Sequence, residues 1–113
     1  MAPSSYPRRG EVYWTALDPS VGSEMQKTRP CLVISSNRAN RERRTVVVIP
    51  LSTTSPKAFP FYVAVPSASK DSLAVIDQLR AVDRTRIGGW YCTLTSSEMS
   101  LIVDAMRLVF ELQ

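Results

Sequence analysis

Residues 22–36 have the sequence Gly-Ser-Glu-Met-Gln-Lys-Thr-Arg-Pro-Cys-Leu-Val-Ile-Ser-Ser, and the rest of the chain is organised around them. The first half is polar and ends at Arg29, whereas Cys31 to Ile34 form an unbroken apolar run, as in a fully buried strand. Pro30 lies at the junction, where its fixed φ angle and missing N–H suit the first residue of a strand. The stretch therefore predicts a polar loop attached to a core strand. The planar, permanently charged guanidinium of its arginine suits a phosphate, and equally a nearby carboxylate.

The composition is that of a small globular protein with a basic charge balance. The chain has 113 residues, enough for one domain with a single modest core, and 44% of them are hydrophobic. The net charge of +4 and the pI of about 9.4 favour an anionic partner, either nucleic acid or an acidic protein. The sequence contains no histidine, which excludes Ser–His–Asp catalysis and histidine-ligated metal. We expect residues 1–8 to be a flexible arm and residues 9–113 to form the domain.

The sequence shows no signal for membrane insertion, secretion or metal binding by cysteine. No apolar run approaches the ~20 residues of a membrane span, and the first residues do not resemble a signal peptide. We therefore expect a cytoplasmic protein that does not enter a membrane. Cys31 and Cys92 lie in apolar surroundings without the spacing of metal ligands, so we expect buried reduced thiols, no metal and no cofactor.

Short segments with strand character follow one another along most of the chain. Residues 10–17 alternate between two faces, and other segments are rich in β-branched and aromatic residues. The predicted strands cover residues 10–17, 30–35, 45–51, 59–65, 73–76 and 79–82. We expect Pro50 at a strand end or a bulge, and Gly88-Gly89 to interrupt the chain. Strands this short and closely spaced predict a small, partly open, mostly antiparallel β-barrel.

Two polar segments separate the first strands. The loop at residues 18–29 is long for so small a domain, and loops of this length tend to be functional or disordered. Residues 37–44 carry four arginines and one glutamate. We expect a loop there, either solvated or in contact with a phosphate backbone.

The end of the chain has the clearest helical signal. Thr95-Ser-Ser-Glu98 is a capping box, which predicts a helix from about Ser96 to Glu111. The helix has two apolar stripes. One comprises Met99, Ile102, Val103, Met106 and Phe110, and the other Leu101, Ala105, Leu108 and Leu112. One stripe would cover the barrel, and we expect the second to lie in the two-fold interface of a homodimer or in a second intramolecular contact.

Five motifs occur in order over most of residues 9–112. They are Arg-Gly-Glu-Val-Tyr at 9–13, Leu-Asp-Pro-Ser-Val-Gly-Ser-Glu at 17–24, Lys-Thr-Arg-Pro-Cys-Leu-Val-Ile-Ser at 27–35, Val-Val-Val-Ile-Pro-Leu-Ser-Thr-Thr at 46–54 and Asp-Gln-Leu-Arg-Ala-Val-Asp-Arg-Thr-Arg-Ile at 77–87. This ordered set resembles the MazF/PemK-type toxins of bacterial toxin–antitoxin pairs. The resemblance implies a mainly β fold: a small SH3-like, partly open β-barrel of the CcdB/PemK type with a C-terminal α-helix and short helical or loop decorations. It also implies a cognate acidic antitoxin and a homodimer.

The resemblance further implies a metal-independent endoribonuclease that cleaves single-stranded RNA, leaving a 2′,3′-cyclic phosphate and a 5′-hydroxyl. The family's catalytic residues correspond to Arg29 and to Ser52, where the family commonly has threonine; Thr53 is a neighbouring substitute. A guanidinium hardly gives up its proton, so we assign Arg29 to stabilising the anionic phosphorane rather than to acid–base transfer. Glu24 is then the available base, or equally a surface carboxylate.

Further polar residues in these segments are candidates for RNA binding. They are Ser23, Gln26, Lys27, Thr28, Thr53, Asp77, Gln78, Arg84 and Arg86. Arg84 and Arg86 would equally form ion pairs with Asp77 and Asp83. Two other functions stay open. One is that of the gyrase-poisoning relatives, which end in Trp-Gly-Ile where this chain ends in Glu-Leu-Gln; the other is an SH3-like module that binds proteins.

Overall fold

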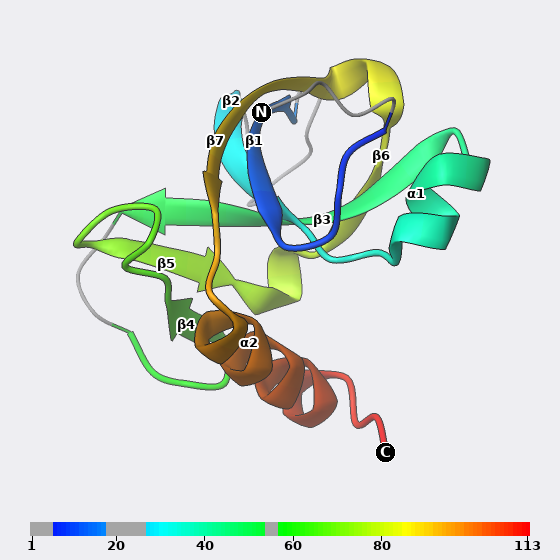
Figure 1. The fold of residues 1–113 in the computed structure, drawn as a ribbon. Coiled ribbons are helices and arrows are strands. Elements are labelled where there is room, and N and C mark those ends of the chain that lie inside the picture. Colours follow the sequence, from blue (N-terminus) through cyan, green and yellow to red (C-terminus); the bar gives the residue numbers. More distant parts are fainter. Residues whose placement is uncertain (1–5, 18–26, 54–56) are drawn as a thin grey trace.

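An open antiparallel sheet and a C-terminal helix make up the computed structural model, which describes residues 6–17, 27–53 and 57–113 (Figure 1). The sheet order is β4-β5-β3-β2-β1-β7, and β6 pairs with β3. The strands are β1 (Glu11–Ala16), β2 (Thr28–Val33), β3 (Thr45–Thr53), β4 (Tyr62–Ala64), β5 (Ser72–Val75), β6 (Arg80–Asp83) and β7 (Ile87–Thr93). The helices are α1 (Asn37–Glu42), η1 (Ile76–Gln78), η2 (Arg84–Arg86) and α2 (Ser96–Val109). The predicted mainly β fold with a C-terminal helix is confirmed.

Strand β3 is the centre of the sheet and has β2 on one edge and two successive partners on the other. Its first half pairs with β6 as far as Val48, and its last residues pair with β5 from Leu51 onward. Pro50 lies between these two ladders while it pairs with Cys31 of β2. A proline has no N–H to donate, so the change of partner accommodates it. We had expected Pro50 at a strand end or at a bulge, whereas it lies inside β3, between the two ladders.

Alternation of side chains along the strands produces two apolar clusters, one on each face of the sheet. The larger cluster lies between the sheet and α2 and includes Val12, Leu32, Ile49 and Ile102. The smaller cluster comprises Tyr13, Leu17, Cys31, Val33, Val46, Val48 and Val82. Residues of β1, β2 and β3 contribute to the clusters alternately, as the period of two requires. The sheet is thus buried on both faces over its central strands.

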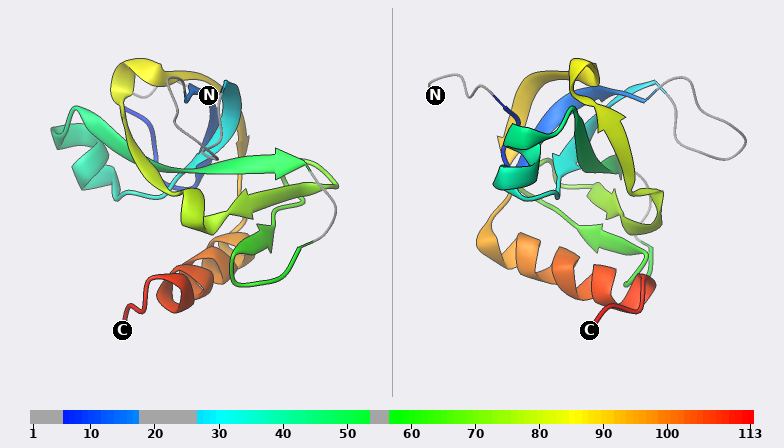
Figure 2. Two further views of the ribbon diagram at one scale, coloured as in Figure 1. Left: turned by 180° about the vertical axis from the view of Figure 1, so that it is seen from behind. Right: turned by 90° about the vertical axis from the view of Figure 1, so that its right-hand side faces the viewer.

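Helix α2 packs beneath β4 and η1, as Figure 2 shows from two further sides. The predicted capping box is present, because Thr95 Oγ1 accepts from the Glu98 N–H and Glu98 Oε1 accepts from the Thr95 N–H. The predicted second apolar stripe of this helix, which comprised Leu101, Ala105, Leu108 and Leu112, is wrong at one residue. Ala105 is fully buried in the core with Ile102, whereas Leu101, Leu108 and Leu112 are about half exposed.

Other sequence-based boundaries need correction as well. The strand predicted at 59–65 is limited to Tyr62–Ala64, and α2 ends at Val109 rather than Glu111. The Gly88-Gly89 pair does not interrupt the chain but lies inside β7. A Cβ on Gly88 would come within 2.9 Å of the Trp14 carbonyl oxygen, so the glycine permits this close approach of β7 to β1.

The arginine-rich segment at 37–44 also differs from the prediction, because most of it forms α1 instead of a loop. The Ser36 side chain caps the helix by accepting from the Ala39 N–H. Asn40 is completely buried, and its Nδ2 donates to the Ser35 carbonyl oxygen at 3.0 Å. These two polar anchors fix a short helix that shows no apolar periodicity. Within the described residues, no helix has the length and hydropathy to cross a membrane.

Candidate functional site

Arg29 occupies a paired strand and not the end of a loop. Strand β2 begins at Thr28, two residues earlier than the predicted start, and Arg29 pairs with Thr15 of β1. The Arg29 side chain is half-buried. Because a strand pair on a packed sheet fixes the backbone, the base of this side chain is held in a defined place.

The sheet register brings Ser52 to the same end of the sheet as Arg29. Cys31 of β2 pairs with Pro50 of β3. Arg29 precedes Cys31 by two residues, and Ser52 follows Pro50 by two. In an antiparallel pair these positions are opposite one another and share a face. Continuation of this register beyond the Cys31–Pro50 pair would therefore place the two predicted catalytic residues opposite one another.

The neighbouring hydroxyl of Thr53 is arranged differently. Ser52 pairs with Leu73 of β5 and is half-buried, whereas Thr53 pairs with Ser72 and is exposed. Successive strand residues point to opposite faces. Thr53 therefore does not share the face of Arg29 and is poorly placed to replace Ser52.

A second arginine, Arg80, lies at this site and was missed in the sequence analysis. Arg80 pairs with Val48 of β3 and so shares the face of Cys31 and Val48. Burial raises the pKa of the Cys31 thiol to about 11, while a hydrogen bond with Thr15 and the charges of Arg80 and Arg29 act in the opposite direction. The charges of both guanidinium groups therefore act on the same thiol. The signal in the sequence was a charged residue on the core-facing side of a predicted strand.

The predicted substrate-side segment holds Arg80 in place. The Arg80 side chain donates from Nη2 to Gln78 Oε1 at 3.1 Å and from Nε to the Gln78 carbonyl at 3.4 Å. Gln78 is half-buried in η1, and Asp77 beside it is exposed. Gln78 thus orients the Arg80 guanidinium.

The remaining predicted arginines lie in η2, at the rim of this site. Arg86 donates from Nη1 to the Ala16 carbonyl at 3.4 Å, and Ala16 pairs with Thr28 at the start of β2. The Asp83 carboxylate accepts from the N–H and the hydroxyl of Thr85 at 2.9 and 2.8 Å. These two bonds, together with the charges of Arg44 and Arg86, hold the pKa of Asp83 below its usual value. Arg84 opens the same turn and is half-buried.

The predicted loop residues are only partly described. Thr28 is exposed, and Lys27 has a φ angle of 69° while its carbonyl accepts from the Leu17 N–H at 3.0 Å. A positive φ at a non-glycine residue is uncommon, so Lys27 marks a defined closure where the loop re-enters the sheet. The other three predicted residues, Ser23, Glu24 and Gln26, lie outside the described residues.

The chemistry of the assembled site is that of an anion-binding surface with a hydroxyl group. Arg29 and Arg80 supply forked guanidinium groups that match the oxygens of a phosphate. Ser52 adds a neutral donor. The buried Glu11 carboxylate accepts a hydrogen bond from the Tyr13 hydroxyl. Burial, and to a smaller extent this hydrogen bond, raise the pKa of Tyr13 to about 12. That pair is therefore engaged within the fold and not in proton transfer.

The chain is similar to known proteins over almost its whole length. Over residues 8–110 the chain matches the family described as PemK-like, MazF-like toxin of type II toxin–antitoxin system. It is 29% identical to endoribonuclease MazF9 of Mycobacterium tuberculosis, over 93% of this chain and 97% of that protein. It is 30% identical to endoribonuclease EndoA of Bacillus subtilis, over 89% of this chain and 91% of that protein.

Solved structures of similar proteins have the same fold. An endoribonuclease from a mycobacterial species, in complex with its cognate antitoxin, aligns with a TM-score of 0.80 at 27% identity, over 95% of this chain and 97% of that chain. MazF from Deinococcus radiodurans aligns with a TM-score of 0.84 at 21% identity, over 96% of this chain and 99% of that chain. The CcdB/PemK-like fold that the resemblance implied is therefore confirmed. With a family match that spans nearly the whole chain, this protein belongs to the PemK-like, MazF-like toxins of type II toxin–antitoxin systems.

Proposed function

We propose that the protein is an endoribonuclease that cleaves single-stranded RNA without a metal ion. The observation that carries the proposal is the convergence of Arg29, Ser52 and Arg80 on one face at one end of the sheet. Relatives along almost the whole chain are named endoribonucleases, which supports the same activity here.

The residues suit transfer of the phosphoryl group to the neighbouring 2′-hydroxyl. The 2′-oxygen loses its proton to a base and attacks the phosphorus atom, and the bond to the 5′-oxygen breaks. The departing oxygen takes up a proton, leaving a 2′,3′-cyclic phosphate and a 5′-hydroxyl. Both arginines stabilise the negative charge that develops on the non-bridging oxygens, and Ser52 donates a further hydrogen bond. Glu24 remains our proposed base.

We propose that residues at the rim of the site bind the nucleotides on either side of the cleaved phosphate. Gln78 and Asp77 offer an amide and a carboxylate to base edges, whereas Arg84, Arg86, Lys27 and Thr28 suit the phosphate backbone. Ser23, Gln26 and Thr53 stay proposed contacts of the same kind. Such a division would give the enzyme a preference for a short sequence motif.

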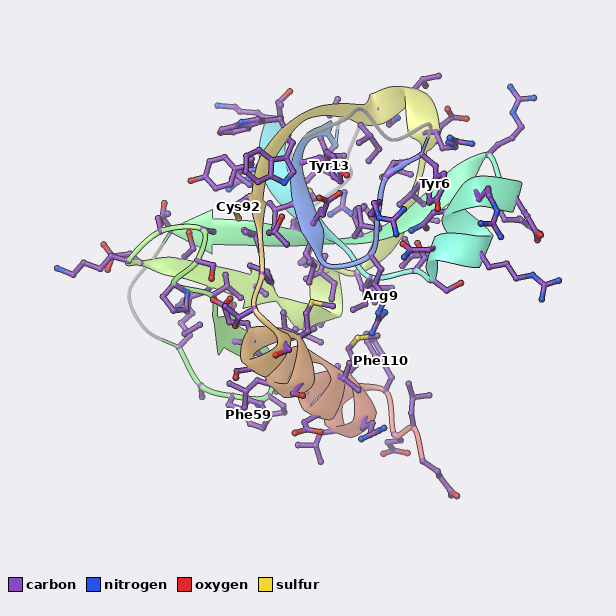
Figure 3. The ribbon with its side chains drawn as sticks, in the orientation of Figure 1. Tyr6, Arg9, Tyr13, Phe59, Cys92 and Phe110 are labelled. Atoms are coloured by element: carbon purple, nitrogen blue, oxygen red, sulfur yellow. The ribbon has the colours of Figure 1, made fainter. Side chains whose placement is uncertain are left out.

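We also propose a homodimer formed through α2. Leu101 and Leu108 of α2 and Leu112 just beyond it are 49%, 60% and 54% exposed, which leaves a large apolar area at this end of the chain. A hollow of about 550 Å³ lies at the other apolar stripe of α2, where Val103, Met106 and Phe110 line it, and of the three leucines only Leu112 borders it. Arg9 and Phe110, which border this hollow, face each other across it in Figure 3. A two-fold axis on the flank of α2 that carries Leu101 and Leu108 would bury these exposed leucines.

The protein partner that we propose is an acidic antitoxin. A mycobacterial relative has been solved in complex with its cognate antitoxin, and the +4 charge of this chain favours an acidic ligand. A disordered acidic segment that folds on binding would bury apolar residues beside α2 and place carboxylates on the arginines. Bound there, it would exclude RNA.

The decisive experiment is incubation of the purified protein with a long RNA in EDTA, followed by analysis of the ends. We expect cuts at a recurring short motif, with cyclic-phosphate and 5′-hydroxyl ends. Cleavage that requires added Mg²⁺ and leaves 3′-hydroxyl ends would contradict the mechanism. A complete lack of cleavage would return the protein to the gyrase-poisoning or protein-binding alternatives.

A further inference from the structure

We propose that a track of arginines leading from α1 past η2 to Arg29 binds the backbone of single-stranded RNA outside the cleavage site. The inference rests on the proposed endoribonuclease function and adds a second contact region for the same substrate. The track consists of Arg38, Arg41, Arg43, Arg44 and Arg86.

Helix α1 and the two residues that follow it expose four arginines to solvent. Arg38, Arg41, Arg43 and Arg44 are all exposed, with 81% of the Arg38 side chain accessible. The helix is held from below by the fully buried Asn40. The acidic residue of the segment, Glu42, lies 3.5 Å from Arg38. Three positive charges therefore remain in excess over seven consecutive residues.

An aromatic ring lies among these arginines. The guanidinium carbon of Arg41 is 6.0 Å from the centre of the Tyr6 ring, and that of Arg8 is 5.5 Å away. Figure 3 shows Tyr6 beside α1. Cation–π contacts hold the arginines over the ring, and an aromatic ring beside cations is a common surface for single-stranded nucleic acid.

The track continues from α1 to the cleavage site without a gap in the chain of contacts. The Arg84 N–H donates to the Arg44 carbonyl at 2.9 Å, which joins the end of α1's segment to η2. Both Arg44 and Arg86 act on the Asp83 carboxylate. Arg86 then contacts Ala16, whose strand partner Thr28 is adjacent to Arg29. In Figure 1, α1 and η2 lie on the same side of the sheet.

A polynucleotide fits this surface better than an acidic peptide does. A disordered peptide that folds on binding needs apolar pockets to offset the entropy of ordering. The exposed leucines lie on α2, and the α1 segment between Asn37 and Arg44 exposes none. A row of exposed cations instead matches the evenly spaced phosphates of RNA, whose binding releases counterions.

The test compares two variants that each remove two positive charges from the full-length protein. Arg41→Gln with Arg43→Gln alters the track, and Lys70→Gln with Arg107→Gln is the control, since both control residues are exposed on other elements. Binding is measured by fluorescence anisotropy with two RNAs that are 2′-deoxy at the cut site. One spans only the cleavage motif, and the other extends it on both sides with oligouridine.

For the long RNA, we expect the track variant to lower the slope of log K against log salt by about 1.4, that is, about 0.7 for each lost phosphate contact. Between 50 and 200 mM salt, its affinity deficit relative to the wild type would then shrink about sevenfold. The control variant should keep the wild-type slope, and Arg41→Lys with Arg43→Lys should restore most of the lost slope.

Three results would overturn the track. They are an unchanged slope in the Arg41/Arg43 variant, an equal loss on the short and the long RNA, or a loss of affinity only for an acidic antitoxin peptide. Each of these is distinct from failure of the proposed function, in which the wild-type protein would cleave no RNA.

Discussion

Removal of the Arg29 guanidinium tests the proposed site directly. Arg29 lies in a paired strand, so its side chain is preorganised, and loss of one preorganised donor typically costs 10²–10³ in kcat, or about 2.7–4 kcal/mol. We expect Arg29→Ala to lie near the lower limit, about 10²-fold, because Arg80, which shares the face of Cys31, remains to stabilise the phosphate. The fold should survive, since the Arg29 side chain is only half-buried.

The assay is single-turnover cleavage of a fluorescent RNA in EDTA, with binding measured separately. Arg80→Ala and the double variant complete a mutant cycle. If both arginines stabilise one phosphorane, the losses will not add, because residues that share a ligand show coupling. Arg107→Ala, on the exposed side of α2, is the control for removal of a positive charge.

A result that refutes the reasoning is easily recognised. An Arg29→Ala protein that cleaves at the wild-type rate would remove Arg29 from the mechanism, and strictly additive losses would separate Arg80 from it. The Cys31 thiol gives an independent check of geometry. Because the charges of Arg80 and Arg29 oppose the effect of burial on the Cys31 pKa, either substitution should raise that pKa further.

Four other predictions concern stability, reactivity and assembly. Burial raises the pKa of Glu98, but hydrogen bonds from Ser67 and Thr95 outweigh it and leave the pKa below its usual value, so Glu98→Gln should lower the free energy of unfolding by about 2 kcal/mol at pH 7. That deficit should begin to shrink as the pH falls below about 4.3, the ordinary pKa of glutamate in an unfolded chain, and should vanish only below the lower pKa of Glu98 in the folded protein; a deficit independent of pH in urea titrations would contradict it. Cys31 should resist thiol reagents at pH 8, because its pKa of about 11 leaves little thiolate, and fast labelling of the folded protein would argue against its burial. Leu101→Glu with Leu108→Glu should give monomers in sedimentation velocity, and a variant that stays dimeric would place the interface elsewhere. Cleavage should persist in EDTA and weaken as salt rises, whereas dependence on Mg²⁺ would exclude the metal-free mechanism.

Several local features were predictable from the sequence because the interactions that produce them are short in range. The capping box from Thr95 to Glu98 fixes the start of α2 within one turn of helix. The apolar run after Pro30 predicts a core strand, since a fully buried strand needs apolar side chains on both faces. The same reasoning fails at α1, where Ser36 and the buried Asn40 form a helix that has no apolar face.

The composition of the site depended on tertiary structure. The sequence, through its resemblance to a family, predicted that Arg29 and Ser52 belong to one site, and local periodicity predicted the strands that carry them. Only the register of β2, β3 and β6 decided that Arg80 shares a face with Cys31 and that Thr53 is on the opposite face. Likewise, only packing decided that Ala105 belongs to the core while its stripe partners Leu101 and Leu108 are exposed. The physical reason is the same in each case: periodicity shows which side chains share a face of one element, whereas the neighbour of that face is decided by contacts between residues far apart in the chain.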